Sequence, residues 1–454
     1  DPSGVLDSTE AVQRAIDAAS AAGGGIVFFP AGRYHFEGTL LIRHDRIVLR
    51  GEGPQASRLS FTRFAGMTGK SHITFQGDVE EGADILLVED GIDRATFVEV
   101  ADATSLAVGD DIAVGWVITD DFVEEHGMSL SWQAFNGTWR PFFRRRVVGL
   151  DLASTPHRVF LDVPLRYPAK TRDFASIRKE TGYLSEVGIE SLGVANAVGW
   201  EDAWSELRVH VIDLIGVKDG WVRDVASFPA PDPAAQGYHL QSGGIRVLAS
   251  KRVTVADCVM EKAQNRGGGG CGYLYEISKS NEILVRDSVG RDGRHNFIQN
   301  WDFGTTGCVF LRCSSAGSRT FASISDPVGT PAYNEYHHSL AMANLVDRCH
   351  LEDGWYGGNR DGASSGAGHT VTQSVYWNTS GGGEILSWQY GWGYVIGTTD
   401  MAVVTLLGPP RSAGTAPADY VEGENRGATL DPPSLFEDQL QRRLSLPEGS
   451  QSLP

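Results

Sequence analysis

Short β-rich segments recur along the second half of the chain, and this recurrence constrains the fold more than any other feature. Each segment combines β-branched or apolar residues with a small one, and the six are WVRDVAS (221–227), VTVADCV (253–259), ILVRDSV (283–289), VFLRCSS (309–315), NLVDRCH (344–350) and HTVTQSV (369–375). With Val225, Cys258, Ser288, Cys313, Cys349 and Ser374 as equivalent positions, the spacings are 33, 30, 25, 36 and 25 residues. Each spacing is long enough for one coil and a loop, and a single coil cannot bury its apolar face alone. The pattern therefore predicts coils that stack into a tube.

Three of the five cysteines, Cys258, Cys313 and Cys349, fall at the same position of this repeat. In a stack of parallel strands, equivalent side chains form a ladder with steps of about 4.8 Å. We expect a ladder of small apolar side chains inside the tube, and a disulfide or a reactive thiol is the alternative. Because the cysteines are few, odd in number and without CxxC spacing, they indicate neither a disulfide framework nor a zinc site.

The first fifty residues predict an amphipathic helix followed by short strands. Asp7 to Glu10 has capping-box spacing, Val12, Ile16 and Ala19 share one helical face, and three glycines end the helix. The run STEAVQRAIDAASAAGGGIVFFPAGRYHF…LLIRHDRIVLRGEG resembles the start of proteins of the pectate lyase superfamily. This resemblance implies an all-β fold, a right-handed parallel β-helix capped at its N-terminal end by this helix. It also implies action on an extended polysaccharide in a groove along one flank of the β-helix.

Composition divides the chain into four expected parts. Residues 1–97 hold the capping helix and the first coils, and residues 98–185 form a β-rich insertion that is aromatic and basic around SWQAFNGTWRPFFRRRVVGLD. Residues 186–407 form the main β-helix with its loops. Residues 408–454 form a tail whose segment SLFEDQLQRRL predicts a short amphipathic helix, either capping the C-terminal end or packing along the outside. A cap at that end would protect unpaired strand edges.

Charge and hydropathy exclude several classes of partner. A net charge of −18, from 39 basic and 57 acidic residues, argues against nucleic acid or an anionic membrane, because phosphate binding needs a basic face. No apolar run is long enough for a membrane span. The chain begins at Asp1 without Met, which fits a processed export product as well as a trimmed sequence. We expect a secreted or periplasmic protein with a polysaccharide or oligosaccharide partner, and the sequence makes no prediction of oligomeric state.

Three loops between Ser288 and Ser374 carry the polar residues suited to chemistry, since surface loops carry function more often than stability. They are GRDGRHNFIQNWDFG (290–304), SRTFASISDPVGTPAYNEYHHSLAMAN (318–344) and DGWYGGNRDGASSGAGHT (353–370). The candidate catalytic residues are Arg294, His295, Asp302, Asp326, Glu335, His337, His338 and Arg360. The candidate substrate-binding residues are Arg319, Trp301, Trp355, Asn359, His369, Glu384 and Trp388.

The density of arginine and histidine in these loops favours a polysaccharide lyase. Such an enzyme neutralises a uronate carboxylate, removes the adjacent proton and protonates the leaving oxygen. Arg294 or Arg360 would neutralise the carboxylate, and His337, His338 or Tyr336 would exchange the protons. Histidine titrates near neutrality and therefore suits proton transfer.

Two other functions stay open. A glycoside hydrolase needs two carboxylates, about 5–5.5 Å apart for retention or about 6.5–9.5 Å for inversion, and Asp302, Asp326, Glu335 and Glu384 are the candidates. A tailspike-like or adhesin-like glycan binder would instead scatter Asp302, Asp326, Glu335, His337 and His338 around the tube. We expect no cofactor and no metal: the acids are too dispersed to predict a calcium site, although calcium stays possible.

Overall fold

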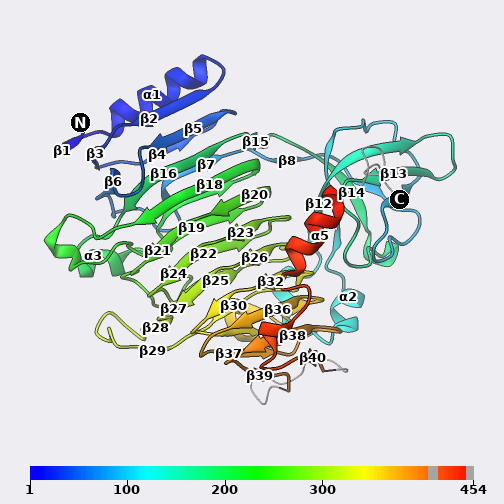
Figure 1. Cartoon of the computed structure of the whole chain (residues 1–454). Coiled ribbons are helices and arrows are strands. Elements are labelled where there is room, and N and C mark those ends of the chain that lie inside the picture. Colours follow the sequence, from blue (N-terminus) through cyan, green and yellow to red (C-terminus); the bar gives the residue numbers. More distant parts are fainter. Residues whose placement is uncertain (407–417, 446–454) are drawn as a thin grey trace.

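A computed structural model describes residues 1–406 and 418–445 of the chain. Most of them form a stack of parallel coils that begins beneath α1 (Thr9–Ala21) and continues to the last strands (Figure 1). No helix among the described residues has the length and apolar character needed to cross a membrane. The predicted parallel β-helix is confirmed.

The larger parallel sheet, sheet A, has nineteen strands. They are β1 (Ser3–Asp7), β2 (Gly25–Phe29), β3 (Gly32–Phe36), β5 (Ile47–Gly51), β6 (Ser57–Phe61), β15 (Leu184–Ser185), β16 (Gly188–Ala195), β18 (Val217–Ser227), β20 (Lys251–Ala256), β21 (Val259–Glu261), β23 (Leu284–Arg286), β24 (Val289–Arg291), β26 (Val309–Leu311), β27 (Ser314–Ala316), β32 (Leu345–Asp347), β33 (His350–Leu351), β36 (Val375–Ser380), β38 (Tyr394–Thr399) and β40 (Tyr420–Glu422). Each coil contributes one or two short strands to sheet A, and the sheet therefore extends along the whole stack.

Sheet B, on the opposite side of the coils, has ten strands. They are β4 (Leu40–Ile42), β7 (Ser71–Gln76), β17 (His210–Ile215), β19 (Gly243–Leu248), β22 (Tyr273–Ser278), β25 (His295–Gln299), β30 (Asn334–Tyr336), β34 (Trp355–Gly357), β37 (Glu384–Ser387) and β39 (Ala402–Val404). Two short pairs lie outside both sheets: β28 (Arg319–Thr320) with β29 (Thr330–Pro331), and β31 (Ala341–Met342) with β35 (Val371–Thr372).

Sheet A bends once per coil at a residue with a left-handed backbone. These residues are Asp224, Asp257, Asp287, Arg312, Arg348 and Asn378, with φ between 50° and 56°. Asp and Asn enter this region more readily than most residues. Ladder pairing shows that the next residues, Val225, Cys258, Ser288, Cys313, Cys349 and Thr379, stack on one another. Five positions of the sequence alignment are therefore confirmed, but Ser374 was wrong, because His350 pairs with Ser380 and so places Thr379 on Cys349.

The cysteine ladder lies inside the tube. All five cysteines are buried and free, which rules out the disulfide alternative. Burial raises the pKa of the Cys258 thiol to about 12, so it carries no thiolate at neutral pH. These cysteines act as small core residues, as expected.

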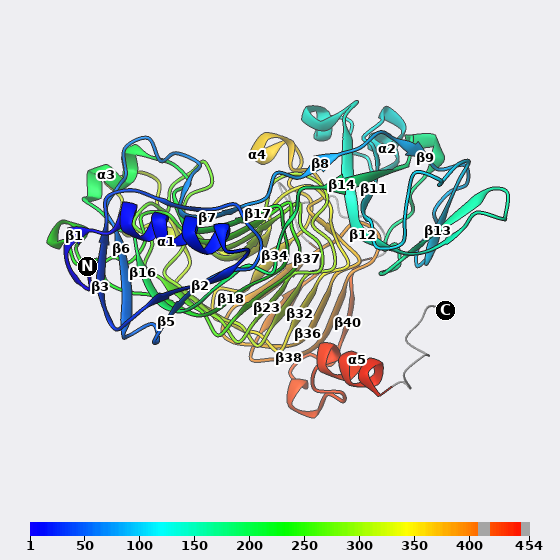
Figure 2. The same ribbon diagram turned by 90° about the horizontal axis from the view of Figure 1, so that it is seen from above.

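Helix α1 covers the N-terminal end of the coils, as predicted (Figures 1 and 2). Ile16 is buried, and Val12 and Ala19 pack against the core beside it. The capping box is not formed as expected, since the N-cap Ser8 makes no side-chain capping bond. Instead Asp7 Oδ1 accepts the backbone N–H of Thr9 at 2.9 Å, which satisfies a donor of the first turn.

A seven-stranded antiparallel sheet forms a separate layer beside the coils (Figure 1). Its strands are β8 (Glu80–Glu81), β9 (Ile85–Leu86), β10 (Phe97–Val100), β11 (Asp111–Val117), β12 (Trp139–Asp151), β13 (His157–Leu161) and β14 (Ser176–Thr181). It has its own core, in which Trp116 stacks on Phe142 with ring centroids 3.6 Å apart. We call the segment from Glu80 to Thr181 the insertion. It begins earlier than the expected range 98–185, because β8 and β9 pair with β14.

The C-terminal helix α5 (Leu435–Leu444) lies along the outside of sheet A and does not cap the stack (Figure 2). Ser434 Oγ and the backbone N–H of Phe436 both donate to Asp347 Oδ2, at 2.8 and 2.7 Å. Arg348 reaches Glu437 of the helix at 3.5 Å. The remaining tail residues, 407–417 and 446–454, lie outside the described part of the chain.

The buried His72 makes stability depend on pH. Its Nε2 donates to the carbonyl of Arg63 at 2.8 Å and its Nδ1 accepts from the Asn196 amide at 3.1 Å, so the neutral ring is satisfied. Burial lowers its pKa from 6.5 to about 4. The unfolded chain therefore takes up this proton first, and the stability from His72, present above pH 6.5, is lost as the pH falls toward 4. One such shift contributes about 3 kcal/mol to the free energy of unfolding.

We expect the thermal midpoint to fall over this pH window, and to fall less steeply in His72→Gln, which cannot be protonated. Melting both proteins in buffers across the window tests this. Parallel curves for the two proteins would contradict the assignment.

Candidate functional site

The outer face of sheet B carries a row of side chains from successive coils. Ladder pairs place Arg246 beside Glu276, Glu276 beside Ile298, and Ile298 beside Glu335. Glu335 in turn pairs with Tyr356 of β34. The row follows the axis of the stack, so residues far apart in sequence meet on one surface.

Glu335 is the centre of a buried cluster on this face. Its Oε2 lies 2.7 Å from His337 Nδ1 and 3.2 Å from His295 Nε2, and its Oε1 is paired with Arg360 Nη1. Burial would raise the pKa of Glu335, but His337, His295 and Arg360 together hold it well below its usual range. Glu335 is therefore an ionised carboxylate that accepts hydrogen bonds from His337 and Arg360.

The contacts of the two histidines fix their orientation. His295 Nδ1 donates to the carbonyl of Tyr333 at 2.6 Å, and burial lowers the pKa of His295 to about 3. His337 Nδ1 donates to Glu335, which leaves His337 Nε2 without that hydrogen. A carboxylate that holds one imidazole nitrogen sets the tautomer and direction of the other.

Arg294 and Tyr273 complete the surroundings of the cluster. Arg294 Nη1 donates to the carbonyl of Gly267 at 2.7 Å, while its Nε is buried without a hydrogen-bond partner. Arg294 forms no ion pair with any described residue. The Tyr273 ring lies 5.3 Å from the His295 ring and 6.3 Å from the His337 ring. Burial raises the pKa of Tyr273 well above its usual range, so its hydroxyl keeps its proton.

An apolar patch adjoins the cluster on the same face. It consists of Tyr356 and Leu386 with Tyr333 and Trp388 packed against them. Trp388, a predicted substrate-binding residue, is partly buried against this patch. Glu384, another candidate, lies exposed at the border and accepts from the Tyr333 hydroxyl at 3.4 Å.

Toward the N-terminal end, the face continues into a hollow of about 430 Å³. Arg63, Lys70 and Arg246 line it together with Asp213. Arg246 is paired with Asp213 at 2.5 Å, whereas neither Arg63 nor Lys70 forms an ion pair with a described residue. This end of the face therefore offers uncompensated positive charge, although the whole chain is acidic.

A second buried pair lies between the hollow and the cluster. His210 Nε2 is 3.0 Å from Glu276 Oε2, and Asn300 donates to Glu276 Oε1 at 2.9 Å. Burial opposes ionisation of Glu276, but His210 and Arg246 lower its pKa to about 2. Glu276, like Glu335, is thus a carboxylate at neutral pH.

Asp302 has no free oxygen for proton transfer. Arg140 of the insertion binds its Oδ1 at 2.8 Å, and Lys279 lies 3.0 Å from its Oδ2. The side chain is buried, and its Oδ1 also accepts the N–H of Phe303 at 2.8 Å. Asp302 joins the insertion to the coils, and the structure offers no support for its expected role as an acid.

The long loop between Ser318 and Asn344 divides into a part that reaches the cluster and a part that does not. Glu335 and His337 reach it, whereas both nitrogens of His338 are taken, by Ser339 Oγ at 2.9 Å and the Ser364 carbonyl at 2.7 Å. Asp326 accepts the N–H of Gly329 at 3.1 Å, and Arg319 Nε donates to Val328 at 2.6 Å. Asp326 and Arg319 therefore shape the loop.

Two candidates, Trp355 and Tyr336, face the interior of the tube, and these two expectations were wrong. Trp355 is fully buried in the core of the tube, 5.0 Å from the Phe310 ring, so it offers no surface to a sugar. Tyr336 lies beside it in the same core. Asn359 and His369 are also buried. Trp301, by contrast, is 43% exposed.

The cluster also has the composition of a metal site. One ring nitrogen each of His295 and His337 and a Glu335 oxygen lie within 4.8 Å of one another, and two imidazoles with one carboxylate suit a divalent transition metal. The sequence did not predict this group, because His295 comes from a different coil than Glu335 and His337. Arg360 is paired with the same carboxylate, so a cation would have to compete with a fixed positive charge.

Solved structures share this fold. The tailspike gp61 of Pseudomonas phage phi297 is 13% identical with a TM-score of 0.51, over 91% of this chain and 65% of that one. The Gp54 tailspike of Acinetobacter baumannii bacteriophage AP22, solved in complex with A. baumannii capsular saccharide, is 12% identical with a TM-score of 0.51, over 89% of this chain and 57% of that one. At this identity the likeness concerns the fold alone.

The N-terminal part also matches a known family. Residues 1–99 match the family described as Rhamnogalacturonase A/epimerase, pectate lyase-like. The chain is a parallel β-helix protein whose first 99 residues are similar to this pectate lyase-like family. This β-helix protein spans less than two thirds of either tailspike. No curated protein matched its sequence.

Sequence reasoning missed Tyr273, His210 and Glu276 of this β-helix protein. A strict period of two would place Tyr273 inside with Tyr275, but Leu274 and Tyr275 both join the core. The strand thus starts with two consecutive inward residues, and Tyr273 lies beside the histidines outside the core. The segment YLYEIS (273–278) did contain a signal for this part of the site, since the acidic Glu276 interrupts an otherwise apolar strand.

Proposed function

We propose that this β-helix protein is a polysaccharide lyase that cleaves a uronate-containing chain lying along sheet B. The observation that carries the proposal is the Glu335–His337 pair beside Arg294, on the outer face of the coils. Such a polymer lies outside the cell, so we also propose a secreted or periplasmic location. The saccharide in the Gp54 complex supports glycan binding by this kind of fold.

His337 acts as the base. With its Nδ1 hydrogen held by Glu335, the free Nε2 lone pair takes the proton next to the uronate carboxylate. Glu335 stays ionised and stabilises the imidazolium that forms, and Arg360 holds the carboxylate in place. Positive charge on His337 is thus balanced as it develops.

Arg294 and Tyr273 serve the other two steps. Arg294 forms no ion pair with the residues that the structure describes, and it neutralises the substrate carboxylate so that the adjacent proton becomes acidic. Tyr273 retains its proton because it is buried, and it donates this proton to the oxygen that leaves. One carbon–oxygen bond breaks, a carbon–carbon double bond forms, and no water is consumed.

The surroundings fit an acidic polymer. The patch at Tyr333 and Trp388 offers apolar surface to sugar rings, and the hollow at Arg63 and Lys70 offers positive charge to a further uronate. These features lie on either side of the cluster along one face, as an extended chain requires.

A glycoside hydrolase is the alternative. Glu276 and Glu335 are two ladder steps apart, which corresponds to about 9.6 Å between strands and is close to the spacing of inverting enzymes. However, both have pKa values below the usual range, so neither holds a proton to donate. Glu335 and His337 meet, which favours an enzyme, whereas Asp302, Asp326 and His338 lie apart from them, as a purely binding protein would have them.

A screen of uronate-containing and neutral polysaccharides, read by ultraviolet absorbance and by reducing ends, tests the proposal. We expect both signals to rise together on a uronate polymer, because elimination leaves a conjugated double bond. Reducing ends without absorbance would indicate a hydrolase. Binding without either signal would indicate a glycan-binding protein.

A further inference from the structure

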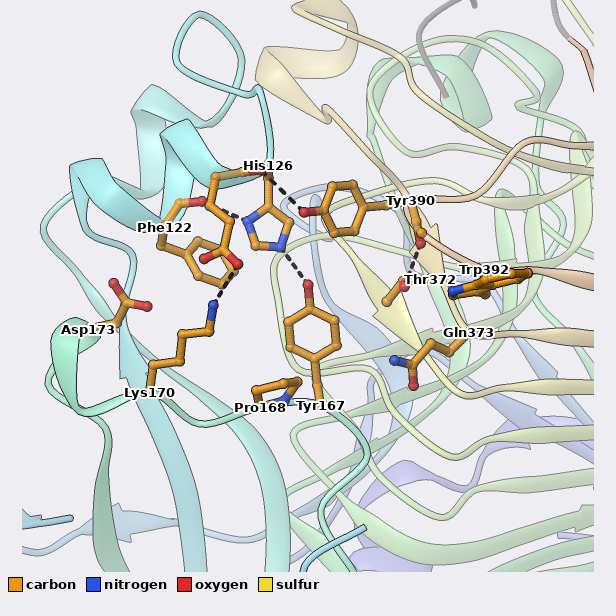
Figure 3. A pocket seen from close by; sticks show the side chains of 12 residues that line it. Phe122, His126, Tyr167, Pro168, Lys170, Asp173, Thr372, Gln373, Tyr390 and Trp392 are labelled. Atoms are coloured by element: carbon orange, nitrogen blue, oxygen red, sulfur yellow. Dashed lines mark hydrogen bonds and ion pairs between the residues drawn. The ribbon is translucent and has the colours of Figure 1, made fainter. Parts of the chain in front are cut away.

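A cavity of about 210 Å³ lies at the junction between the insertion and the last coils (Figure 3). Phe122 and Tyr167 of the insertion face Tyr390 and Trp392 of the coils across it. The loop from Asn359 to His369 separates it from the Glu335 cluster. Arg360 of that loop pairs with Glu335, whereas the His369 ring lies 5.1 Å from Tyr390.

The aromatic walls are held in place by their polar ends. His126 Nδ1 donates to the carbonyl of Phe122 at 2.6 Å, so its Nε2 accepts from the Tyr167 hydroxyl at 2.7 Å. The Tyr390 hydroxyl donates to the backbone carbonyl of Glu125 at 3.2 Å. Figure 3 shows both contacts. Trp392 is 52% exposed at the rim, with open ring surface.

The charged groups of the cavity are already compensated. Lys170 Nζ lies 2.5 Å from Glu125, and Arg172 bridges Glu125 at 2.7 Å and Asp173 at 2.9 Å. A charged ligand would find no unpaired partner here. Gln373 is the polar group that remains: its side-chain amide bonds to no other described residue, and it lies beside Trp392 (Figure 3).

Size and chemistry together point to one kind of ligand. Pockets for drug-sized ligands enclose about 300–1,000 Å³, so this cavity fits a single ring and not a chain. A pyranose has an apolar C–H face and a rim of hydroxyls, which match an aromatic wall and an amide. We propose that this cavity binds one uncharged pyranose unit of a glycan, stacked on Trp392 and hydrogen-bonded to Gln373. The proposal does not depend on lyase chemistry.

Calorimetric titration of the full chain with neutral hexoses, N-acetylhexosamines and glucuronate tests it. We expect at least one neutral sugar to bind in preference to glucuronate. Trp392→Ala should weaken that binding about tenfold, because it removes the stacking surface. Gln373→Ala should weaken it by a smaller factor. Phe28→Ala, which removes an equally exposed aromatic ring from β2 at the N-terminal end of sheet A, should leave it unchanged.

Equal affinity of the Trp392→Ala and unaltered proteins would overturn the proposal, as would preference for glucuronate or no binding of any neutral sugar. A monosaccharide has no glycosidic bond to cleave. The result is therefore independent of whether the Glu335 cluster acts as a lyase.

Discussion

Replacing His337 by alanine lowers the rate of polysaccharide cleavage by a factor of about a hundred to ten thousand, the range expected for loss of a general base. The reason is specific to its geometry. Glu335 holds His337 Nδ1 at 2.7 Å and directs His337 Nε2 away from the carboxylate. No other described side chain on this face has a nitrogen at the same place and in the same tautomer. Initial rates on the best polymer from the screen, for both proteins, give the measurement.

His350→Ala is the matched control. His350 also pairs with a glutamate, Glu352 at 2.8 Å, but it is exposed on sheet A. We expect its activity and thermal midpoint to equal those of the unaltered protein. If His337→Ala folds normally and keeps activity within a few-fold, His337 is not the base.

Replacing Trp355 by alanine destabilises the fold by about 3–5 kcal/mol, as for other large aromatic residues removed from a core. Trp355 packs against Phe310 and Tyr336 inside the tube, and no part of it reaches the surface. Because each coil rests on its neighbours, the loss weakens the stack on both sides. Thermal and urea-induced unfolding measure the effect.

Trp392→Ala serves as the comparison, since Trp392 is half-exposed and surface substitutions usually change stability by about 0.5 kcal/mol or less. The pair also separates two roles for tryptophan in this protein. If Trp355→Ala kept full stability and lost glycan binding instead, Trp355 would be a sugar platform and its core position would be wrong.

The repeat predicted the fold because each coil must place a small residue at the same bend. Five positions from Val225 to Cys349 were correct for this reason. Ser374 was misaligned because the last coil has two small hydroxyl residues at interior corners. Ser374 Oγ accepts the N–H of Asn344 at 3.1 Å, whereas Thr379 stacks on Cys349. Composition alone does not distinguish these two corners.

The site was only partly predictable. Arg294, His295, Glu335, His337 and Arg360 were selected from their loops, and the structure brings them together on one face. One of the predicted acidic residues, Asp302, is instead held outside the site in a long-range ion pair with Arg140 of the insertion. This contact links residues more than one hundred positions apart, so no local pattern contains it.

The most direct test of the lyase mechanism is digestion in oxygen-18 water followed by mass spectrometry of the products. Elimination consumes no water, so we predict fragments with an unsaturated end and no oxygen-18 from cleavage. Incorporation of one oxygen-18 atom per broken bond, with saturated ends, would contradict the lyase proposal and establish hydrolysis.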